Sequence, residues 1–332
     1  MGMEDVIGHA AQIAQLRGDL ESGNLAHAYL FVGPPHVGKF SVAKAFAAEI
    51  LLRDVAPAGR ERAAHQIERL IHPDLLVLDQ LWIEDVQEDW DAIAKTSNVP
   101  QEHRADSSRS MKTDTIGIDD VRAVQDRLYA TGGPHRCCLV RSVERMQDEA
   151  ANALLKILEE PPPGRVFVLT AAAASLLLPT VVSRCRVLHF HPLAHRDLAP
   201  LLEDFPEEDR GFLLHLAQGS PGVLRTMRDD PDRRREERLM HTAALGFWTA
   251  TSLVDRLKTL TPLHKRGPEA ERFLLHLSLA LRDCHPQMRA AWGSALLELA
   301  RLLQTNANRA LLCTRFALQV AAVSLSPVSS LQ

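Results

Sequence analysis

The feature that most constrains this chain is a glycine-rich turn between a predicted strand and a predicted helix. The turn reads GPPHVGK at 33–39, and it matches the G-x-x-x-x-G-K pattern of a phosphate loop. A short apolar run at 28–32 precedes it, and a helical pattern follows it. In such a loop the glycines let backbone N–H groups surround phosphate, and the lysine reaches the outer phosphates. The sequence therefore predicts a nucleotide-binding loop built on Gly33, Gly38 and Lys39.

The first 190 residues alternate short apolar runs with helical patterns. Runs rich in Val, Leu and Phe predict buried strands at 28–32, 75–78, 137–140, 166–169 and 187–190. Helical patterns lie between them at 41–52, 119–129 and 148–160, and three prolines end the last one. Strands that alternate with helices form parallel sheets, so we predict an α/β domain with helices on both faces of its sheet.

The pattern changes along the 332 residues in a way that predicts three domains. The α/β nucleotide-fold domain covers 1–190 and contains an insertion at about 79–113, which begins with an acidic run. A small helical domain is predicted at 191–228, and a larger all-helical domain at 229–332. The insertion is too long for an ordinary structureless loop, and its acidic run is interpreted as a solvated face rather than a binding site.

Composition places the chain among packed globular proteins. Apolar residues make up 46% of it and charged residues 24%, and the formal net charge is −4. No global positive field draws such a chain onto nucleic acid, so a DNA contact would be local or belong to a larger assembly. The chain has no apolar stretch long enough to cross a bilayer and no apolar leader at its start. We therefore expect a cytoplasmic protein without a membrane partner.

The residue after the phosphate loop departs from the pattern of a working site. A Ser or Thr normally stands there, because its hydroxyl binds Mg²⁺. This chain has Phe40 instead. A phenyl ring supplies no metal ligand, so the loop is predicted to keep its shape without a complete metal site.

The helix predicted at 148–160 carries the most specific motif in the chain. It reads DEAANALLKILEE and runs into prolines, and it resembles the signature helix of clamp-loader subunits, a branch of the AAA+ proteins. Aligned on this resemblance, the acidic pair that would hold Mg²⁺ and position water falls on Arg141 and Ser142. A guanidinium near the metal position would invert the local electrostatics.

Two further positions of the family's motifs are changed. Active relatives place a polar residue that contacts the γ-phosphate after the strand at 166–169, whereas this chain has four alanines that begin at Ala171. The segment GSPG at 219–222 resembles a second sensor motif, with Gly222 where an arginine would stand. The resemblance therefore implies an ATPase fold without its chemistry and a vestigial phosphate loop. It leaves open whether nucleotide binds without being hydrolysed.

One arginine motif of the family is present. Ser183-Arg184-Cys185 is similar to the short motif with which clamp-loader subunits offer an arginine to ATP on the adjacent subunit. Such an arginine finger accelerates phosphoryl transfer by ~10³–10⁵-fold. The resemblance implies this role in trans for Arg184. The alternative is an arginine in a structural ion pair, with Cys185 packed in the core.

Cysteine and histidine spacing predicts no zinc site. The five cysteines contain no C-x-x-C pair, and the segment 53–71, where many relatives carry a four-cysteine module, has none. His65 and His72 are interpreted as surface or turn histidines. We therefore expect no zinc and no other cofactor.

The resemblance implies a subunit of the clamp loader in bacterial DNA polymerase III. Such a subunit would not hydrolyse ATP, would contact gamma/tau and delta-type sister subunits, and would act on the sliding clamp and primer-template DNA through the complex at the nucleoid. The two later domains would then be a helical lid and an assembly collar. One alternative is an ATP-hydrolysing gamma/tau-type subunit, which would need a hydroxyl at position 40 and acids at 141 and 142. The other is an AAA+ protein outside replication, which fits poorly with the motifs around Asn152 and Arg184.

Overall fold

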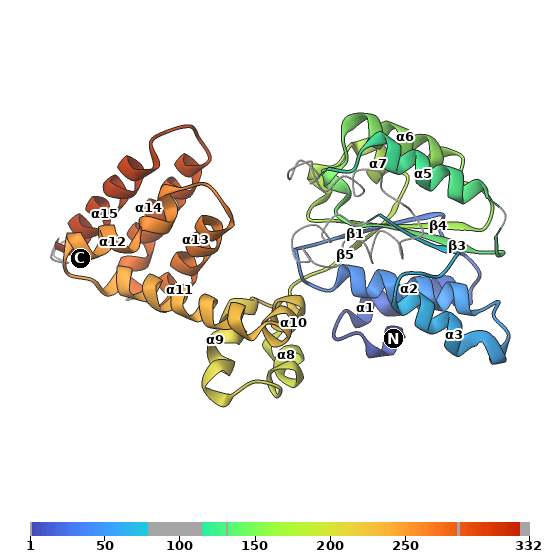
Figure 1. Ribbon diagram of the computed structural model, residues 1–332, viewed down its shortest axis with the longest axis horizontal. Coiled ribbons are helices and arrows are strands. Elements are labelled where there is room, and N and C mark those ends of the chain that lie inside the picture. The colour runs from blue at the N-terminus through green and yellow to red at the C-terminus, as the bar shows by residue number, and fades with distance from the viewer. Residues whose placement is uncertain (1, 79–114, 131, 284–285, 326–332) are drawn as a thin grey trace, which may run out of the picture. The chain divides into compact units, whose positions relative to one another are not determined.

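The computed structural model of this chain describes residues 2–78, 115–130, 132–283 and 286–325. The chain divides into two compact units, whose elements are labelled in Figure 1. Unit 1 comprises Met1–Glu203 with Ala217–Val223, and unit 2 comprises Asp204–Leu216 with Leu224–Gln332. The predicted insertion at 79–113 lies outside the described residues, and the division into three domains stays a prediction.

Unit 1 is built on a five-stranded sheet in the order β2-β3-β4-β1-β5. Its strands are β1 (Ala28–Val32), β2 (Leu75–Leu78), β3 (Arg136–Val140), β4 (Arg165–Ala171) and β5 (Arg186–His189). Every neighbouring pair is parallel. The predicted strands and the α/β class are therefore confirmed, with strand ends shifted by one or two residues.

Helices cover both faces of this sheet (Figure 1). One face carries α1 (Ala10–Glu21), α2 (Lys39–Leu52) and α3 (Pro57–Glu68), and the other carries α5 (Ile118–Tyr129), α6 (Asp148–Glu159) and the short α7 (Pro179–Val182). Successive residues of β1 point to opposite faces, as in any strand. Tyr29 and Phe31 join the core under α2, whereas Leu30 joins the core under α6. Burial on both faces explains why these strands are apolar at consecutive positions.

Every regular element among the described residues of unit 2 is a helix. It contains most of α9 (Glu207–Ala217) and α10 (Pro221–Asp229), followed by α11 (Pro231–Thr249), α12 (Leu253–Thr259), α13 (Pro268–Ala280), α14 (Pro286–Leu303) and α15 (Arg309–Leu325). Its core is aromatic: the Trp248 and Trp292 rings stack with centroids 5.2 Å apart, and the Trp248 indole N–H donates to the Leu277 carbonyl at 2.9 Å. The prediction that helices alone follow residue 190 is confirmed for the described residues.

The charged run at 229–238 forms the start of α11 and is not solvated throughout. Asp230 caps the helix by accepting a hydrogen bond from the Arg233 backbone N–H. Glu237 is buried, and its carboxylate lies 2.5 Å from the His276 ring nitrogen Nε2 and 2.7 Å from Arg272 Nε. Burial works to raise the pKa of Glu237, but His276 and Arg272 outweigh it and lower that pKa. A run this rich in charge predicts a solvated linker or helix face, and that prediction is wrong at Glu237.

No described helix is both long enough and apolar enough to cross a membrane.

The turn that leads into β2 is held by a buried ion pair. Arg136 at the start of β3 donates to Asp74 Oδ1 from Nη2 at 2.9 Å, and it also donates to the Ala130 carbonyl after α5 at 3.3 Å. The Arg136 side chain is 5% exposed.

His72 is a turn residue, as predicted, but it is buried rather than on the surface, and burial lowers its pKa. His65 lies exposed on α3.

We predict that Arg136→Ala lowers the free energy of opening of the β2–β3 edge by about 3 kcal/mol, because it leaves the mostly buried Asp74 carboxylate without its cation and with only the Gly133 N–H as a donor among the described residues. Hydrogen exchange of the β3 amides in increasing urea measures this change. Arg122→Ala is the matched control, since its pair with Asp119 is exposed on both sides; we expect a loss of less than about 0.5 kcal/mol there. Equal losses in both variants would contradict the prediction.

Candidate functional site

The phosphate-loop segment lies at the carboxyl edge of the sheet, directly after β1. The Gly33 backbone N–H donates to the carbonyl of Ala171 at the end of β4, at 3.1 Å. Val140 ends β3 beside Leu169, so Arg141 follows at the same edge. The parallel topology thus brings the segments after β1, β3 and β4 together, as is usual for ligand sites of open α/β sheets.

Both glycines of the loop are required by the backbone itself. A Cβ on Gly33 would lie 2.2 Å from the carbonyl oxygen of Phe190, which is far inside contact distance. Gly38 begins α2 with a φ of 112°, a conformation that L side chains rarely adopt. These contacts give the glycines a structural reason to be present, whether or not a nucleotide binds.

The lysine of the loop contacts its own loop. Lys39 Nζ donates to the carbonyls of Gly33 and Pro34, the latter at 2.7 Å. Burial lowers the pKa of Lys39 to about 8, although the nearby Glu144 carboxylate works to raise it. Two loop carbonyls therefore take the ammonium group that a phosphate would otherwise attract.

The two substitutions at the metal position contact each other. The guanidinium carbon of Arg141 lies 5.1 Å from the centroid of the Phe40 ring, within the range of a cation–π contact. The sequence predicted each loss separately and gave no sign of this pairing. Neither the phenyl ring nor the guanidinium supplies an oxygen of the kind that Mg²⁺ prefers.

An acidic residue that the sequence analysis passed over lies at this edge. Glu144, in the short helix η4 (Val143–Arg145), accepts a hydrogen bond from the Ala172 backbone N–H at 3.1 Å. Its second oxygen is buried without a hydrogen-bond partner among the described residues. The Ser142 N–H donates to Thr170 Oγ1 at 3.1 Å, in a left-handed turn with φ of 54°. The sequence signal for this residue was an acid four residues after β3. It was passed over because the resemblance places the acidic pair at 141 and 142.

The start of α10 hydrogen-bonds to the phosphate-loop segment, and both belong to unit 1. The Gly222 N–H donates to the His36 carbonyl at 2.9 Å, and Ser220 Oγ donates to the Pro35 carbonyl at 3.3 Å. A Cβ on Gly222 would lie 2.9 Å from that same His36 oxygen. The position predicted to have lost a sensor arginine is therefore in direct backbone contact with the loop, where a longer side chain would meet it.

Arg184 lies at the other edge of the sheet. It follows α7 and precedes β5, whose first residue Arg186 pairs with Tyr29 near the start of β1. Because the strands are parallel, Arg184 is at their amino ends and the phosphate loop at their carboxyl ends. The length of β1 separates the two edges by about 13 Å at roughly 3.3 Å per residue. The guanidinium is therefore not part of the site formed by its own loop.

The Arg184 side chain is one-third exposed and makes two contacts. It donates from Nη1 to the Thr180 carbonyl at 3.0 Å and from Nη2 to Glu159 Oε1 at 2.6 Å. Ser183 Oγ also donates to the Thr180 carbonyl, and Cys185 packs against the core, where burial raises its pKa to about 12. The predicted ion-pair alternative is thus present in the structure, but at the surface.

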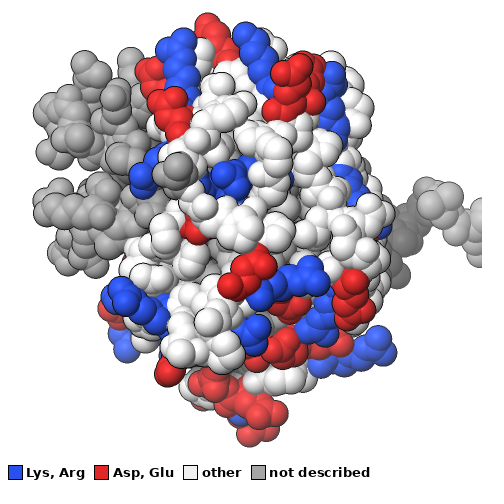
Figure 2. Space-filling model, turned by 90° about the vertical axis from the view of Figure 1, so that its right-hand side faces the viewer, with Lys and Arg blue, Asp and Glu red and all other residues white. Residues whose placement is uncertain are grey.

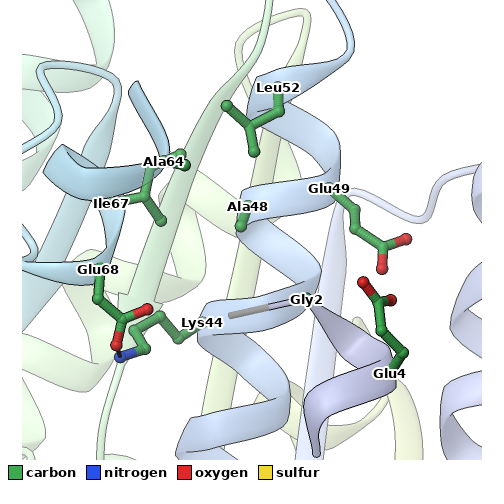
Figure 3. Close-up of a pocket in the computed structure, with 9 residues that line it drawn as sticks. All are labelled: Gly2, Glu4, Lys44, Ala48, Glu49, Leu52, Ala64, Ile67 and Glu68. Carbon is green, nitrogen blue, oxygen red and sulfur yellow. Dashed lines mark hydrogen bonds and ion pairs between the residues drawn. The ribbon is translucent and has the colours of Figure 1, made fainter. Parts of the chain in front are cut away.

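The hollow drawn in Figure 3 is separate from the phosphate loop. It has a volume of about 380 Å³ and is lined by Gly2, Glu4, Lys44, Ala48, Glu49, Leu52, Ala64, Ile67 and Glu68. Lys44 Nζ and Glu68 Oε1 form an ion pair at 2.7 Å on one side of it. Arg17 lies 2.8 Å from Glu4 and 3.7 Å from Glu49, so each carboxylate of the hollow has a cationic neighbour within the protein.

Charge is mixed on the surface that Figure 2 shows. Lys and Arg side chains are interspersed with Asp and Glu, and the described residues there form no broad basic area. Among the described residues, no three His, Cys, Asp or Glu side chains are grouped so as to hold a metal ion. The absence of zinc stays a prediction, and Cys284 lies outside the described residues.

The parallel sheet, the phosphate loop after β1 and the helices after β5 define an AAA+ fold. A family model described as "DNA polymerase III, delta subunit" matches residues 8–194, which is more than half of the chain. The chain therefore belongs to this family of DNA polymerase III clamp-loader subunits.

Curated relatives carry the names of several such subunits. The chain is 34% identical over 206 residues to DNA polymerase III subunit delta' of Pseudomonas aeruginosa, a match of 59% of this chain and 54% of that protein. It is 29% identical over 182 residues to subunit delta' of Bacillus subtilis, covering 54% and 46%. It is 28% identical over 232 residues to subunit tau/gamma of Haemophilus influenzae, covering 67% and 29%. The matches thus span about half or less of these relatives.

Two solved structures from Thermotoga maritima align with the chain at low identity. A protein related to the DNA polymerase III gamma subunit is 16% identical with a TM-score of 0.45, covering 93% of this chain and 99% of that one. The RuvB Holliday junction branch migration motor is 13% identical with a TM-score of 0.45, covering 95% and 90%.

We predict that Mg²⁺ does not tighten any binding of ATP to this chain. The Arg141 and Phe40 pair offers no oxygen ligand, so the apparent Kd for a fluorescent ATP analogue should agree within about twofold between EDTA and excess Mg²⁺, a difference below ~0.5 kcal/mol. Fluorescence titration under both conditions measures it. Tenfold tighter binding with Mg²⁺ would show that the site still holds the metal.

Proposed function

We propose that this chain is a delta-prime-type clamp-loader subunit that does not hydrolyse ATP and that supplies Arg184 to ATP bound by a neighbouring subunit. Membership of the DNA polymerase III family supports the clamp-loader setting. The observation that carries the proposal is the opposite placement of two groups on one sheet. A degenerate phosphate loop lies at the carboxyl edge, and an accessible arginine lies at the amino edge.

The placement of Arg184 favours a role in trans. A strand length separates it from its own loop, so it cannot reach a nucleotide there without large rearrangement. At the surface, however, its guanidinium can approach a nucleotide carried by another subunit. An arginine that meets a phosphoryl group during transfer stabilises the charge that develops on its oxygens.

The contacts of the loop argue against the ATP-hydrolysing gamma/tau alternative. Hydrolysis needs Mg²⁺ between the β- and γ-phosphates and a residue that positions water. Here Phe40 and Arg141 contact each other at the metal position, and Glu144 takes the Ala172 N–H after β4. Relatives of the tau/gamma type match the chain as well, but no contact in this site favours their activity. The second alternative, an AAA+ protein outside replication, has no support from the family match.

The proposed partners are gamma/tau and delta-type sister subunits, with the sliding clamp and primer-template DNA reached through the complex. The helical region at 229–332 is proposed as the collar that joins the subunits, and the region at 191–228 as the lid. The surface of the proposed collar carries the exposed apolar side chains Leu239, Val254, Leu275, Leu297, Leu311 and Leu318. On α15, Leu311 and Leu318 lie seven positions apart and therefore on one face of the helix, as an association surface requires.

We predict that the purified chain releases phosphate from ATP and Mg²⁺ at the background rate. The missing metal ligands remove the electrostatic stabilisation on which phosphoryl transfer depends. A phosphate-release assay on the parent and on Lys39→Ala measures it. Turnover that persists in Lys39→Ala indicates a contaminant, whereas turnover that Lys39→Ala abolishes would refute the absence of activity.

The proposed finger is tested by Arg184→Ala in a complex reconstituted from all its subunits. ATP hydrolysis should fall in part, because the finger's ~10³–10⁵-fold effect applies to one site among several. Arg184→Lys should stay impaired, since lysine keeps the charge but lacks the planar fork that binds two phosphate oxygens. Steady-state hydrolysis and clamp loading measure both variants.

Assembly is the control for this test, measured by size-exclusion chromatography of each complex. Unchanged hydrolysis and loading in an assembled Arg184→Ala complex would refute the finger role. Failure to assemble would favour a structural ion pair instead.

A further inference from the structure

Within this subunit, the Arg184 guanidinium is hydrogen-bonded to the Thr180 carbonyl and the Glu159 carboxylate. Both terminal nitrogens are engaged: Nη1 by the Thr180 carbonyl at 3.0 Å and Nη2 by Glu159 Oε1 at 2.6 Å. A neighbour's phosphate would bind these same nitrogens, because the guanidinium fork matches phosphate and carboxylate oxygens alike. Engagement with Glu159 and engagement with a phosphate therefore compete.

The base of the Arg184 side chain is fixed while its outer end is accessible. The Arg184 N–H donates to the Val181 carbonyl, and the flanking Val182 and Cys185 pack against the core. The side chains of the ion pair are 33% exposed for Arg184 and 50% exposed for Glu159. A pair this exposed contributes little free energy, so a stronger anion can displace the carboxylate without disturbing the backbone.

Glu159 is placed to attract this guanidinium. It is the last residue of α6, where the partial negative charge of the helix end adds to that of its carboxylate. Glu160 follows at the helix cap and is also exposed. The two glutamates share one helix end, but the structure pairs Arg184 with Glu159.

We propose that Glu159 is a positioning residue that holds Arg184 on its own subunit until the phosphates of a neighbour's nucleotide displace the carboxylate. The proposal rests on the proposed function of Arg184 as a finger. It adds that the finger has a retracted state, held by Glu159 and the Thr180 carbonyl, and an engaged state. The population of the retracted state then reduces the apparent affinity for the engaging ligand.

Glu159→Gln tests this proposal in the reconstituted complex. Removing the charge frees Arg184, so the ATP concentration at half-maximal hydrolysis should fall by about twofold to fivefold, the range for loss of an exposed ion pair. The maximal rate should not fall, because the finger itself is intact. Glu160→Gln is the matched control, since it removes one charge from the same helix end and should change neither quantity.

The double variant Glu159→Gln with Arg184→Ala separates this role from a general change of charge. If Glu159 acts through Arg184, the double variant should match Arg184→Ala alone, since no guanidinium remains to be released. The decrease in half-saturating ATP concentration caused by Glu159→Gln should also be smaller at high salt, because salt already screens an exposed ion pair. Thermal melting of each variant checks that unit 1 stays folded.

The outcomes distinguish this inference from the function on which it rests. If Arg184→Ala lowers hydrolysis but Glu159→Gln leaves half-saturation unchanged or lowers the maximal rate, the retracted state is refuted and the finger role stands. An equal effect of Glu160→Gln, or an effect of Glu159→Gln that persists without Arg184, refutes it as well. If Arg184→Ala leaves hydrolysis unchanged in an assembled complex, both the finger role and this inference fail.

Discussion

The parallel pairing of β1 with β4 on one side and β5 on the other determines where everything else in unit 1 can lie. All strands run in one direction, so each segment that follows a strand gathers at one edge and each segment that precedes a strand gathers at the other. The loop at 33–39 and the turn after β3 meet at the first edge. Arg184, which precedes β5, lies at the second. The separation of the phosphate-loop segment from Arg184 thus follows from strand direction alone.

At the carboxyl edge, the polar and charged groups of the loop and its neighbours contact one another. Lys39 donates to loop carbonyls, Arg141 lies over Phe40, Glu144 accepts from the Ala172 N–H, and Gly222 donates to the His36 carbonyl. Each contact satisfies a polar or charged group that would otherwise be left partly buried without a partner, which is costly. The loop keeps its shape because Gly33 packs on the Phe190 carbonyl and Gly38 starts α2.

Much of the fold could be predicted because its signals are local. Five apolar runs gave the strands, since a strand buried on both faces must be apolar at successive positions. What the sequence could not give depends on partners far along the chain. Glu144 was missed because its partner, the Ala172 N–H, is a backbone group with no sequence signal. The burial of Glu237 depends on His276 and Arg272 of α13, and His276 lies 39 residues further along the chain. The Glu159 contact to Arg184 joins two elements separated by β4. Charge patterns show where charged residues lie, but not which of them tertiary packing will pair.

The contact between Phe40 and Arg141 bears on how this site can change in evolution. A Ser at position 40 would remove the aromatic ring that the Arg141 guanidinium contacts. It would also place the guanidinium beside the hydroxyl that normally binds Mg²⁺. An acid at position 141 would face a phenyl ring and would still lack its hydroxyl partner. Because the two side chains contact each other, a substitution at either position changes the surroundings of the other, and the two positions are coupled. The clash that a longer side chain at Gly222 would meet at the His36 carbonyl adds a third. Positions 40, 141 and 222 are thus constrained by contacts with the rest of unit 1, so a substitution at any of them requires a neighbouring group to move.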